Sequence, residues 1–195
     1  DAEFRAIIDH CMTSGKVAQG NAYPARPSIA IADKIAYDTS LPRPDILVLK
    51  VEQWDGEGWT VRQKKKRGEH LELWQPMSPE GVQMVNGYLK GREIVSMSGH
   101  VLTNEQTGKP WNEEFFTRNF AQARKRVGIK GRTFHDLRRT APTEIGNRGA
   151  TNAEIVKFSG HNINSPVLKT YVQPDREAAK RGAEKRSNKG KTSDD

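Results

Sequence analysis

The sequence predicts an α+β domain that is mainly helical and carries a small three-stranded antiparallel sheet. Two observations lead to this fold class. Through most of the chain, apolar residues recur every three or four positions, as on the buried face of an amphipathic helix. Between residues 51 and 74 the period changes to two, and two turns interrupt it. With 195 residues, of which 34% are hydrophobic, the chain is long enough to bury one core.

Seven segments have the features of helices. They are residues 2–12, 28–41, 78–89 and 112–127, the helix that Thr133 caps, residues 151–158 and residues 165–172. Ser28 and Asn112 are expected N-caps, and Pro79 suits the first position of its helix. Gly160 is expected to end the helix before it. Pro142 falls inside the helix that begins at Thr133 and is expected to kink it or end it.

The three expected strands lie between residues 52 and 74. Residues 52–55 and 59–63 flank Gly56-Glu57-Gly58, a turn sequence typical of a β-hairpin. Residues 64–68 form a second, strongly basic turn, and residues 69–74 form the third strand. A basic loop between two strands is therefore expected to project from the sheet.

Charge and composition limit the binding partners and the kinds of site that this chain can have. The formal net charge of +8 favours polyanions such as nucleic acid, although a solubilising surface charge explains it about equally well. Cys11 is the only cysteine, which excludes an intrachain disulfide and a cysteine-based zinc site and fits a reducing cytosol. No apolar run is long enough to cross a bilayer, and no signal peptide is visible. Neither a phosphate-binding Gly-Lys loop nor a metal-ligand cluster is present, so no nucleotide, metal or other cofactor is expected.

The stretch from residue 133 to residue 171 holds the groups that carry chemistry. His135 and Arg138 lie three positions apart, His161 follows a glycine, and Tyr171 comes ten residues later. Cleaving a phosphodiester without metal requires a nucleophile, positive charge on the nonbridging oxygens and a proton for the leaving oxygen. Arg138 is suited to binding the nonbridging oxygens, because its guanidinium can donate two parallel hydrogen bonds. Tyr171 is the candidate nucleophile, since it is the only one of four tyrosines after His161.

These residues resemble the motifs of the tyrosine recombinase, or phage integrase, family. His135-Asp136-Leu137-Arg138 is similar to its HxLR box, Ser159-Gly160-His161 to its LGH box, and Thr170-Tyr171 to its nucleophile region. The ten-residue spacing from His161 to Tyr171 also agrees with the family. The resemblance spans roughly residues 30–175 and implies the DNA breaking-rejoining enzyme fold.

The family also uses an arginine after its second helix, in a T-G-x-R context. The corresponding stretch here is Thr39-Ser40-Leu41-Pro42-Arg43, in which Ser40 replaces the usual glycine. Strict counting from Thr39 selects Pro42, whereas a shift of one residue selects Arg43, which we expect to be the catalytic arginine. If Arg43 is misplaced, the resemblance implies a domain that binds DNA but cleaves it poorly.

The resemblance further implies a lysine on a β-hairpin that protonates the leaving 5′ oxygen. Lys65 is the best match, and Lys64 and Lys66 are the alternatives. Four basic residues are expected to contact DNA: Lys64, Lys66, Arg67 and Arg139. Without the family context, the basic turn would be read as an ordinary exposed loop. Arg139 has an acidic neighbour as the alternative partner, and Asp136 is expected to be a structural hydrogen-bond acceptor.

The implied function is that of a site-specific DNA recombinase or integrase. Tyr171 would form a 3′-phosphotyrosyl link and release a 5′ hydroxyl, with Arg43, Lys65, His135, Arg138 and His161 completing the site. The implied partners are double-stranded DNA and three further copies of the chain, as a homo-tetramer on two DNA sites, with no membrane. The alternatives are a catalytically weakened DNA-binding module of the same fold and a relaxing enzyme of the type IB topoisomerase kind.

The expected organisation is a catalytic domain at residues 1–175 and a basic, flexible tail at residues 176–195. Because the chain starts at Asp1 and relatives usually carry a DNA-clamping domain first, such a domain is expected to precede this chain. The expected location is the bacterial host cytoplasm or nucleoid, on DNA.

Overall fold

The computed structural model describes residues 2–16, 22–64, 70–91, 99–160, 180 and 183–184. The chain divides into two compact units, Asp1–Ala141 and Pro142–Asp195. The predicted boundary at residue 175 and the predicted helix at residues 165–172 lie outside the described residues, so both stay predictions.

Helices predominate among the described residues, which confirms the mainly helical α+β class. Unit Asp1–Ala141 holds α1 (Ala2–Met12), α2 (Pro27–Thr39), α3 (Arg43–Leu47), the 3₁₀ turn η1 (Val51–Gln53), α4 (Pro79–Gly91) and α5 (Glu113–Arg126). Helix α6 (Phe134–Asn147) begins in this unit and continues past its last residue, and α7 (Asn152–Ser159) belongs to Pro142–Asp195. Two antiparallel pairs are described: β1 (Gly15–Lys16) with β2 (Ala22–Tyr23), and β3 (Gly58–Lys64) with β4 (His70–Pro76).

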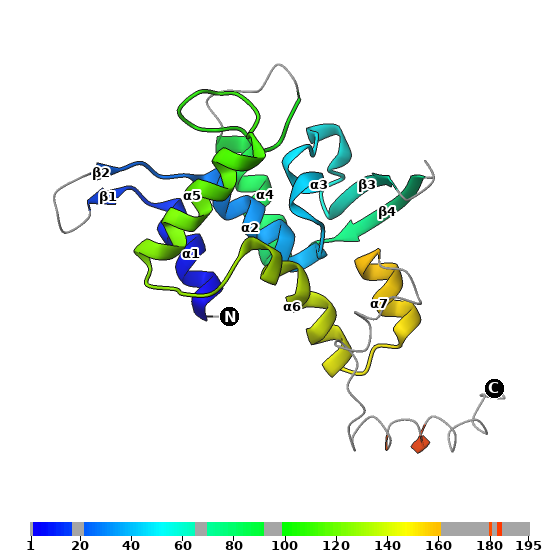
Figure 1. Ribbon diagram of the computed structural model, residues 1–195. Helices are drawn as coiled ribbons and strands as arrows, with labels where there is room; N and C mark the ends of the chain where they lie inside the picture. Colours follow the sequence, from blue (N-terminus) through cyan, green and yellow to red (C-terminus); the bar gives the residue numbers. More distant parts are fainter. Residues whose placement is uncertain are drawn as a thin grey trace. The chain divides into compact units, whose positions relative to one another are not determined.

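Helix α2 is the centre of unit Asp1–Ala141, and α1, α3 and α4 contact it (Figure 1). Most of its residues are buried, including Ile29, Ile31 and Ile35. A helix that is apolar on nearly all sides belongs in a core rather than at a surface.

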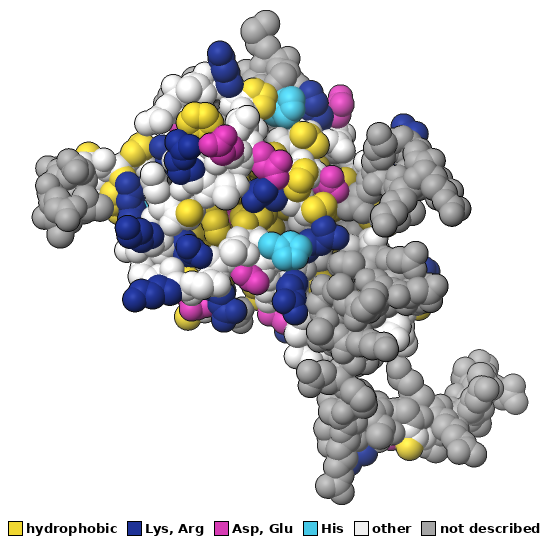
Figure 2. Space-filling view, viewed as in Figure 1, with side chains coloured by type: hydrophobic (Ala, Val, Ile, Leu, Met, Phe, Trp, Pro, Cys, Tyr) yellow, Lys and Arg dark blue, Asp and Glu magenta, His cyan; other side chains and the backbone are white. Residues whose placement is uncertain are grey.

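On the face seen in Figure 2, hydrophobic side chains form only small groups, and basic side chains are spread among acidic ones.

Aromatic packing fixes the start of α6. The ring of Phe134, the first residue of α6, lies 5.3 Å from that of Phe116 and 5.4 Å from that of Phe120, both edge-on. All three side chains are buried, and edge-to-face pairs are a preferred aromatic geometry. The core of α5 therefore anchors the helix that carries His135 and Arg138.

The sheet differs from prediction at its first strand. Strands β3 and β4 pair from Gly58 with Pro76 to Lys64 with His70, as expected. The segment expected as the strand 52–55 instead forms η1, followed by a single bridge between Trp54 and Trp59. The reason is local: the Gln53 side chain accepts a hydrogen bond from the Lys50 N–H at 2.8 Å, which closes a helical turn.

Several predicted helix ends are confirmed. The Asn112 side chain accepts a hydrogen bond from the Glu114 N–H at 2.8 Å, and Pro79 opens α4. Thr151 and Glu154 form a capping box at α7, which ends where Gly160 takes a φ of 66°. Pro142 was expected to kink its helix or end it; α6 continues to Asn147, so Pro142 does not end the helix, and the kink stays a prediction. No helix among the described residues is both long and apolar enough to span a membrane.

Asp33 on α2 is a carboxyl group enclosed by the core. It is fully buried, and neither carboxyl oxygen has a hydrogen-bond partner among the described residues. Burial raises the pKa of Asp33 well above its ordinary value, because an unpaired charge is costly in an apolar environment. Burial first, and then the nearby Asp33, also raise the pKa of the Cys11 thiol. Cys11 is therefore a buried, protonated thiol rather than a reactive one.

Replacing Asp33 with Asn removes the titration and keeps the shape of the side chain. In the wild type, the unfolded chain loses this proton near pH ~4, whereas the folded protein holds it to higher pH. The stability that Asp33 contributes is therefore fully present below pH ~4 and is lost as pH rises toward the raised pKa. Denaturant unfolding across pH should show the free energy of the wild type, relative to Asp33→Asn, falling by up to about 1.4 kcal/mol per pH unit in that window. A difference that does not change with pH would contradict the burial of an unpaired carboxyl.

Candidate functional site

A cavity of about 190 Å³ brings Arg43 together with His135 and Arg138, two predicted catalytic residues that lie far from it in the sequence. We call it the arginine cavity. Arg43, His135 and Arg138 line it, together with Leu41, Pro42, Pro44, Glu113 and Phe134. His135 and Arg138 face the same cavity because residues three apart lie on one side of a helix. Two guanidinium groups and an imidazole around one cavity suit the binding of an anion with several oxygens.

Arg43 reaches the cavity from the start of α3. Pro42 precedes α3 in an extended conformation, with φ −71° and ψ 148°, and Pro44 takes an early position where its missing N–H costs nothing. Arg43 is thus the first residue of the helix, beside a cavity that Pro42 also lines. Both residues selected by the two ways of counting from Thr39 lie here, but only Arg43 has a charged group.

Glu113 is a residue of this cavity that the sequence analysis did not select. Nε of Arg43 donates to Oε1 of Glu113 at 3.1 Å, and Nη2 donates to the same oxygen. Glu113 is the first residue of α5, directly after the N-cap Asn112. An acidic first turn is common in helices for electrostatic reasons, so nothing in the sequence marked Glu113 as a neighbour of Arg43.

Ser40 connects α2 to the backbone of Arg138. It ends α2 with a φ of 61°, and it is the only non-glycine residue with positive φ in the described part of the chain. Such a conformation costs a residue with a side chain on the order of 1 kcal/mol. Its buried hydroxyl donates a 2.7 Å hydrogen bond to the carbonyl oxygen of Arg138. The serine that replaces the family's usual glycine therefore adopts the backbone conformation of a glycine and adds a contact.

This contact explains how α6 passes through a proline. In a regular α-helix, the carbonyl of Arg138 accepts from the N–H four residues later. That residue is Pro142, which has no N–H to donate. The Ser40 hydroxyl supplies a donor to the same carbonyl from outside the helix. The hydrogen bond therefore both compensates for Pro142 and fixes the backbone position of Arg138.

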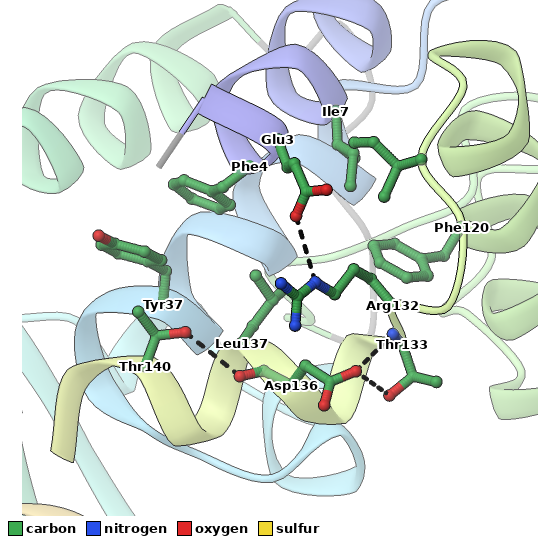
Figure 3. Close-up of a pocket in the computed structure, with 11 residues that line it drawn as sticks. Glu3, Phe4, Ile7, Tyr37, Phe120, Arg132, Thr133, Asp136, Leu137 and Thr140 are labelled. Atoms are coloured by element: carbon green, nitrogen blue, oxygen red, sulfur yellow. Dashed lines mark hydrogen bonds and ion pairs between the residues drawn. The ribbon is translucent and has the colours of Figure 1, made fainter. Parts of the chain in front are cut away.

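The opposite side of α6 borders a second cavity of about 180 Å³, shown in Figure 3. Glu3 on α1 and Arg132 pair across it at 3.2 Å, and apolar side chains such as Phe4 and Leu137 also line it. Asp136 accepts from the Thr133 backbone N–H at 2.7 Å and from the Thr133 hydroxyl at 2.9 Å. The backbone hydrogen bond is the main reason why the pKa of Asp136 lies below its ordinary value. These contacts agree with the prediction that Asp136 is a structural acceptor.

The remaining predicted site residues are described only in part. Lys65, Lys66, Arg67, His161 and Tyr171 lie outside the described residues, and only the backbone of Lys64 is described, as the end of β3. Arg139 is exposed on α6. Within unit Pro142–Asp195, Gly160 turns the chain directly before His161, and its N–H donates to the Val156 carbonyl at 2.9 Å. No group of three His, Cys, Asp or Glu side chains placed to hold a metal ion occurs within the described segments.

The coupling of Ser40 to Pro142 is measurable as a double-mutant cycle. Ser40→Ala should lower the free energy of unfolding by about 1 to 3 kcal/mol, because the hydrogen bond from the hydroxyl to the Arg138 carbonyl is lost while Ala keeps the strained φ. In a Pro142→Ala background the N–H of residue 142 is restored, so the same change should cost about 1 kcal/mol less. Denaturant unfolding of the four proteins gives the coupling energy. Ser40→Gly, which relieves the strain, should cost less than Ser40→Ala. Equal costs of Ser40→Ala in the two backgrounds would show that the hydroxyl does not compensate for the proline.

Comparison with known proteins gives one family and several solved structures. No curated protein matches the sequence. The chain is similar to XerA recombinase, with a TM-score of 0.70 at 16% identity over 95% of this chain and 63% of that one. It is similar to the Tn1549 transposon integrase in complex with transposon right end DNA (TM-score 0.68, 18% identity, 95% of this chain and 64% of that one). It is also similar to a lambda integrase dimer bound to a core site (TM-score 0.60, 18% identity, 90% and 58%).

The chain thus spans less than two thirds of the length of each of these three structures. At such low identities, the likeness shows a common fold. The sequence model of the Phage integrase family matches residues 2–178, which is most of the 195-residue chain. The chain therefore belongs to the phage integrase family.

Proposed function

We propose that this chain is the catalytic part of a site-specific DNA recombinase that cleaves and rejoins DNA without a metal ion. The observation that carries the proposal is the convergence of Arg43, His135 and Arg138 on one cavity. Membership of the phage integrase family supports it, and so do the similar Tn1549 and lambda integrases, which were solved bound to DNA.

In the proposed reaction, the arginine cavity holds the scissile phosphate. Arg43 and Arg138 donate to its nonbridging oxygens, and His135 adds a further donor. The hydroxyl of Tyr171 loses its proton to solvent as its oxygen attacks phosphorus, the bond from phosphorus to the 5′ oxygen breaks, and a 3′-phosphotyrosyl link forms. Lys65 protonates the departing 5′ oxygen, and His161 is a further donor near the nucleophile. Attack by a 5′ hydroxyl from a partner strand reverses these steps, so no external energy source is required.

DNA binding and assembly follow from the same proposal. Lys64, Lys66, Arg67 and Arg139 neutralise backbone phosphates beside the scissile one, and the net charge of +8 favours this electrostatically. The protein acts on double-stranded DNA as a homo-tetramer that holds two sites. Its place of action is the bacterial cytoplasm or nucleoid.

One observation favours a second candidate, a DNA-binding module with weakened cleavage. Strict counting from Thr39 puts Pro42 at the catalytic position, and the guanidinium of Arg43 is paired with Glu113. If Arg43 does not reach the phosphate, one of two guanidinium groups is lost to catalysis. Loss of a single preorganised donor to a developing charge typically lowers the rate about 100- to 1,000-fold.

A covalent-trapping experiment tests the function. The full-length protein is incubated with nicked suicide duplexes that carry its candidate attachment site, and adducts are separated on a denaturing gel. The wild type should form a protein–DNA adduct that Tyr171→Phe abolishes, because the phenol oxygen forms the bond. Tyr88→Phe is the matched control and should leave the adduct unchanged, since Tyr88 lies on α4 and does not line the arginine cavity. Absence of an adduct with the wild type, or an adduct that survives Tyr171→Phe, would refute the proposal.

The position of the catalytic arginine is tested separately in the same assay. Arg43→Ala should lower the rate of adduct formation by about 100-fold or more. The double change Pro42→Arg with Arg43→Pro should not restore it, because it moves the guanidinium to the position before α3. An Arg43→Ala protein with an unchanged rate would remove Arg43 from the site. Faster cleavage by the double change than by the wild type would favour the strict count and the weakened module.

A further inference from the structure

Glu113 holds the edge of the Arg43 guanidinium that faces it. Nε and Nη2 of Arg43 both donate to Oε1 of Glu113, with a Nε–Oε1 distance of 3.1 Å. Glu113 also lines the arginine cavity, with His135 and Arg138. The cavity therefore contains a carboxylate beside Arg43, His135 and Arg138, the three residues that bind a phosphate in the proposed function.

A carboxylate and a phosphate use this edge of an arginine in the same way. The guanidinium presents two parallel N–H bonds, and their spacing fits two oxygens, or one shared oxygen, of either anion. The two anions cannot use the same N–H bonds at the same time. A negative charge that stays in the cavity would also repel the phosphate.

We propose that Glu113 is a competing anion that must leave Arg43 before a DNA phosphate binds there, and that it thereby sets the affinity of the site for DNA. This inference rests on the proposed function, because it requires that Arg43 binds a phosphate of DNA. Glu113 is then a residue that controls substrate binding without taking part in bond cleavage.

The surroundings of the pair suit an exchange of partners. The side chain of Glu113 is 52% exposed and that of Arg43 is 31% exposed. Ion pairs in contact with water are weak, so the cost of breaking this pair is small. Glu113 is the first residue of α5, where the positive end of the helix dipole favours a carboxylate whether or not it is paired. The released side chain therefore keeps a favourable environment.

A positioning role for Glu113 makes the opposite prediction. If the carboxylate served to orient Arg43 toward the phosphate, then removing its charge would loosen the guanidinium and weaken DNA binding. Competition predicts that removing the charge strengthens DNA binding, and only while Arg43 is present. The two roles are therefore separated by the direction of the effect and by its dependence on Arg43.

The test is a binding titration of full-length protein with a labelled duplex that carries the candidate attachment site. Glu113→Gln removes the negative charge and keeps the shape of the side chain. Glu114→Gln is the matched control: it makes the same change of net charge in the same helical turn, at a residue that pairs with Arg118 instead. Glu113→Gln should bind DNA about two- to fivefold more tightly than Glu114→Gln. In an Arg43→Ala background, the two glutamine variants should bind equally.

Covalent trapping of the same variants adds a second readout. Under single-turnover conditions, Glu113→Gln should lower the DNA concentration that gives half-maximal cleavage relative to Glu114→Gln, because the competing anion acts on DNA binding. Equal binding by the two glutamine variants, weaker binding by Glu113→Gln, or a gain that persists without Arg43 would each overturn the inference. Failure of the proposed function is a distinct result, in which DNA binds but wild-type protein forms no adduct. The binding titration then still decides whether Glu113 competes at Arg43.

Discussion

The hydrogen bond from the Ser40 hydroxyl to the Arg138 carbonyl is the interaction on which the site depends. It joins the end of the central helix α2 to α6, at the residue whose side chain lines the arginine cavity. Because Pro142 has no N–H, the carbonyl of Arg138 cannot receive the usual helical hydrogen bond, and the Ser40 hydroxyl donates one to it instead. The strained backbone of Ser40 and the proline inside α6 are each unfavourable alone. Together they are compensated, because the Ser40 hydroxyl donates the hydrogen bond that Pro142 cannot donate.

The apolar framework positions the other groups of the site. Helix α2 is buried along its length and ends at Ser40, and two prolines then direct the chain into α3 with Arg43 as its first residue. The edge-on contacts of Phe134 with Phe116 and Phe120 fix the start of α6. His135 and Arg138 follow within one turn. The charged side chains of the cavity therefore come from the starts of α3 and α6, which are anchored by buried residues. This anchoring restricts the positions of the side chains before a phosphate binds.

Features of the fold that depend on neighbouring residues could be predicted from the sequence. Contacts between residues far apart in the chain could not. The cap at Asn112 and the helix end at Gly160 depend on one residue and the backbone next to it, so the sequence predicts them directly. The 3₁₀ turn in place of a strand at residues 52–55 depends on the Gln53 side chain, and alternation alone did not reveal it. The motif spacing predicted His135 and Arg138 together. The pairing of Arg43 with Glu113, 70 positions apart, and the role of Ser40 required the folded chain.

The central claim is that Arg43, His135 and Arg138 bind one phosphate. A structure of the Tyr171→Phe protein with an intact duplex carrying its attachment site tests this claim most directly. The account predicts that the guanidinium groups of Arg43 and Arg138 both lie within hydrogen-bond distance of nonbridging oxygens on a single phosphate, with Glu113 displaced from Arg43. A complex in which Arg43 stays paired with Glu113, while a different cation contacts that phosphate, would contradict it.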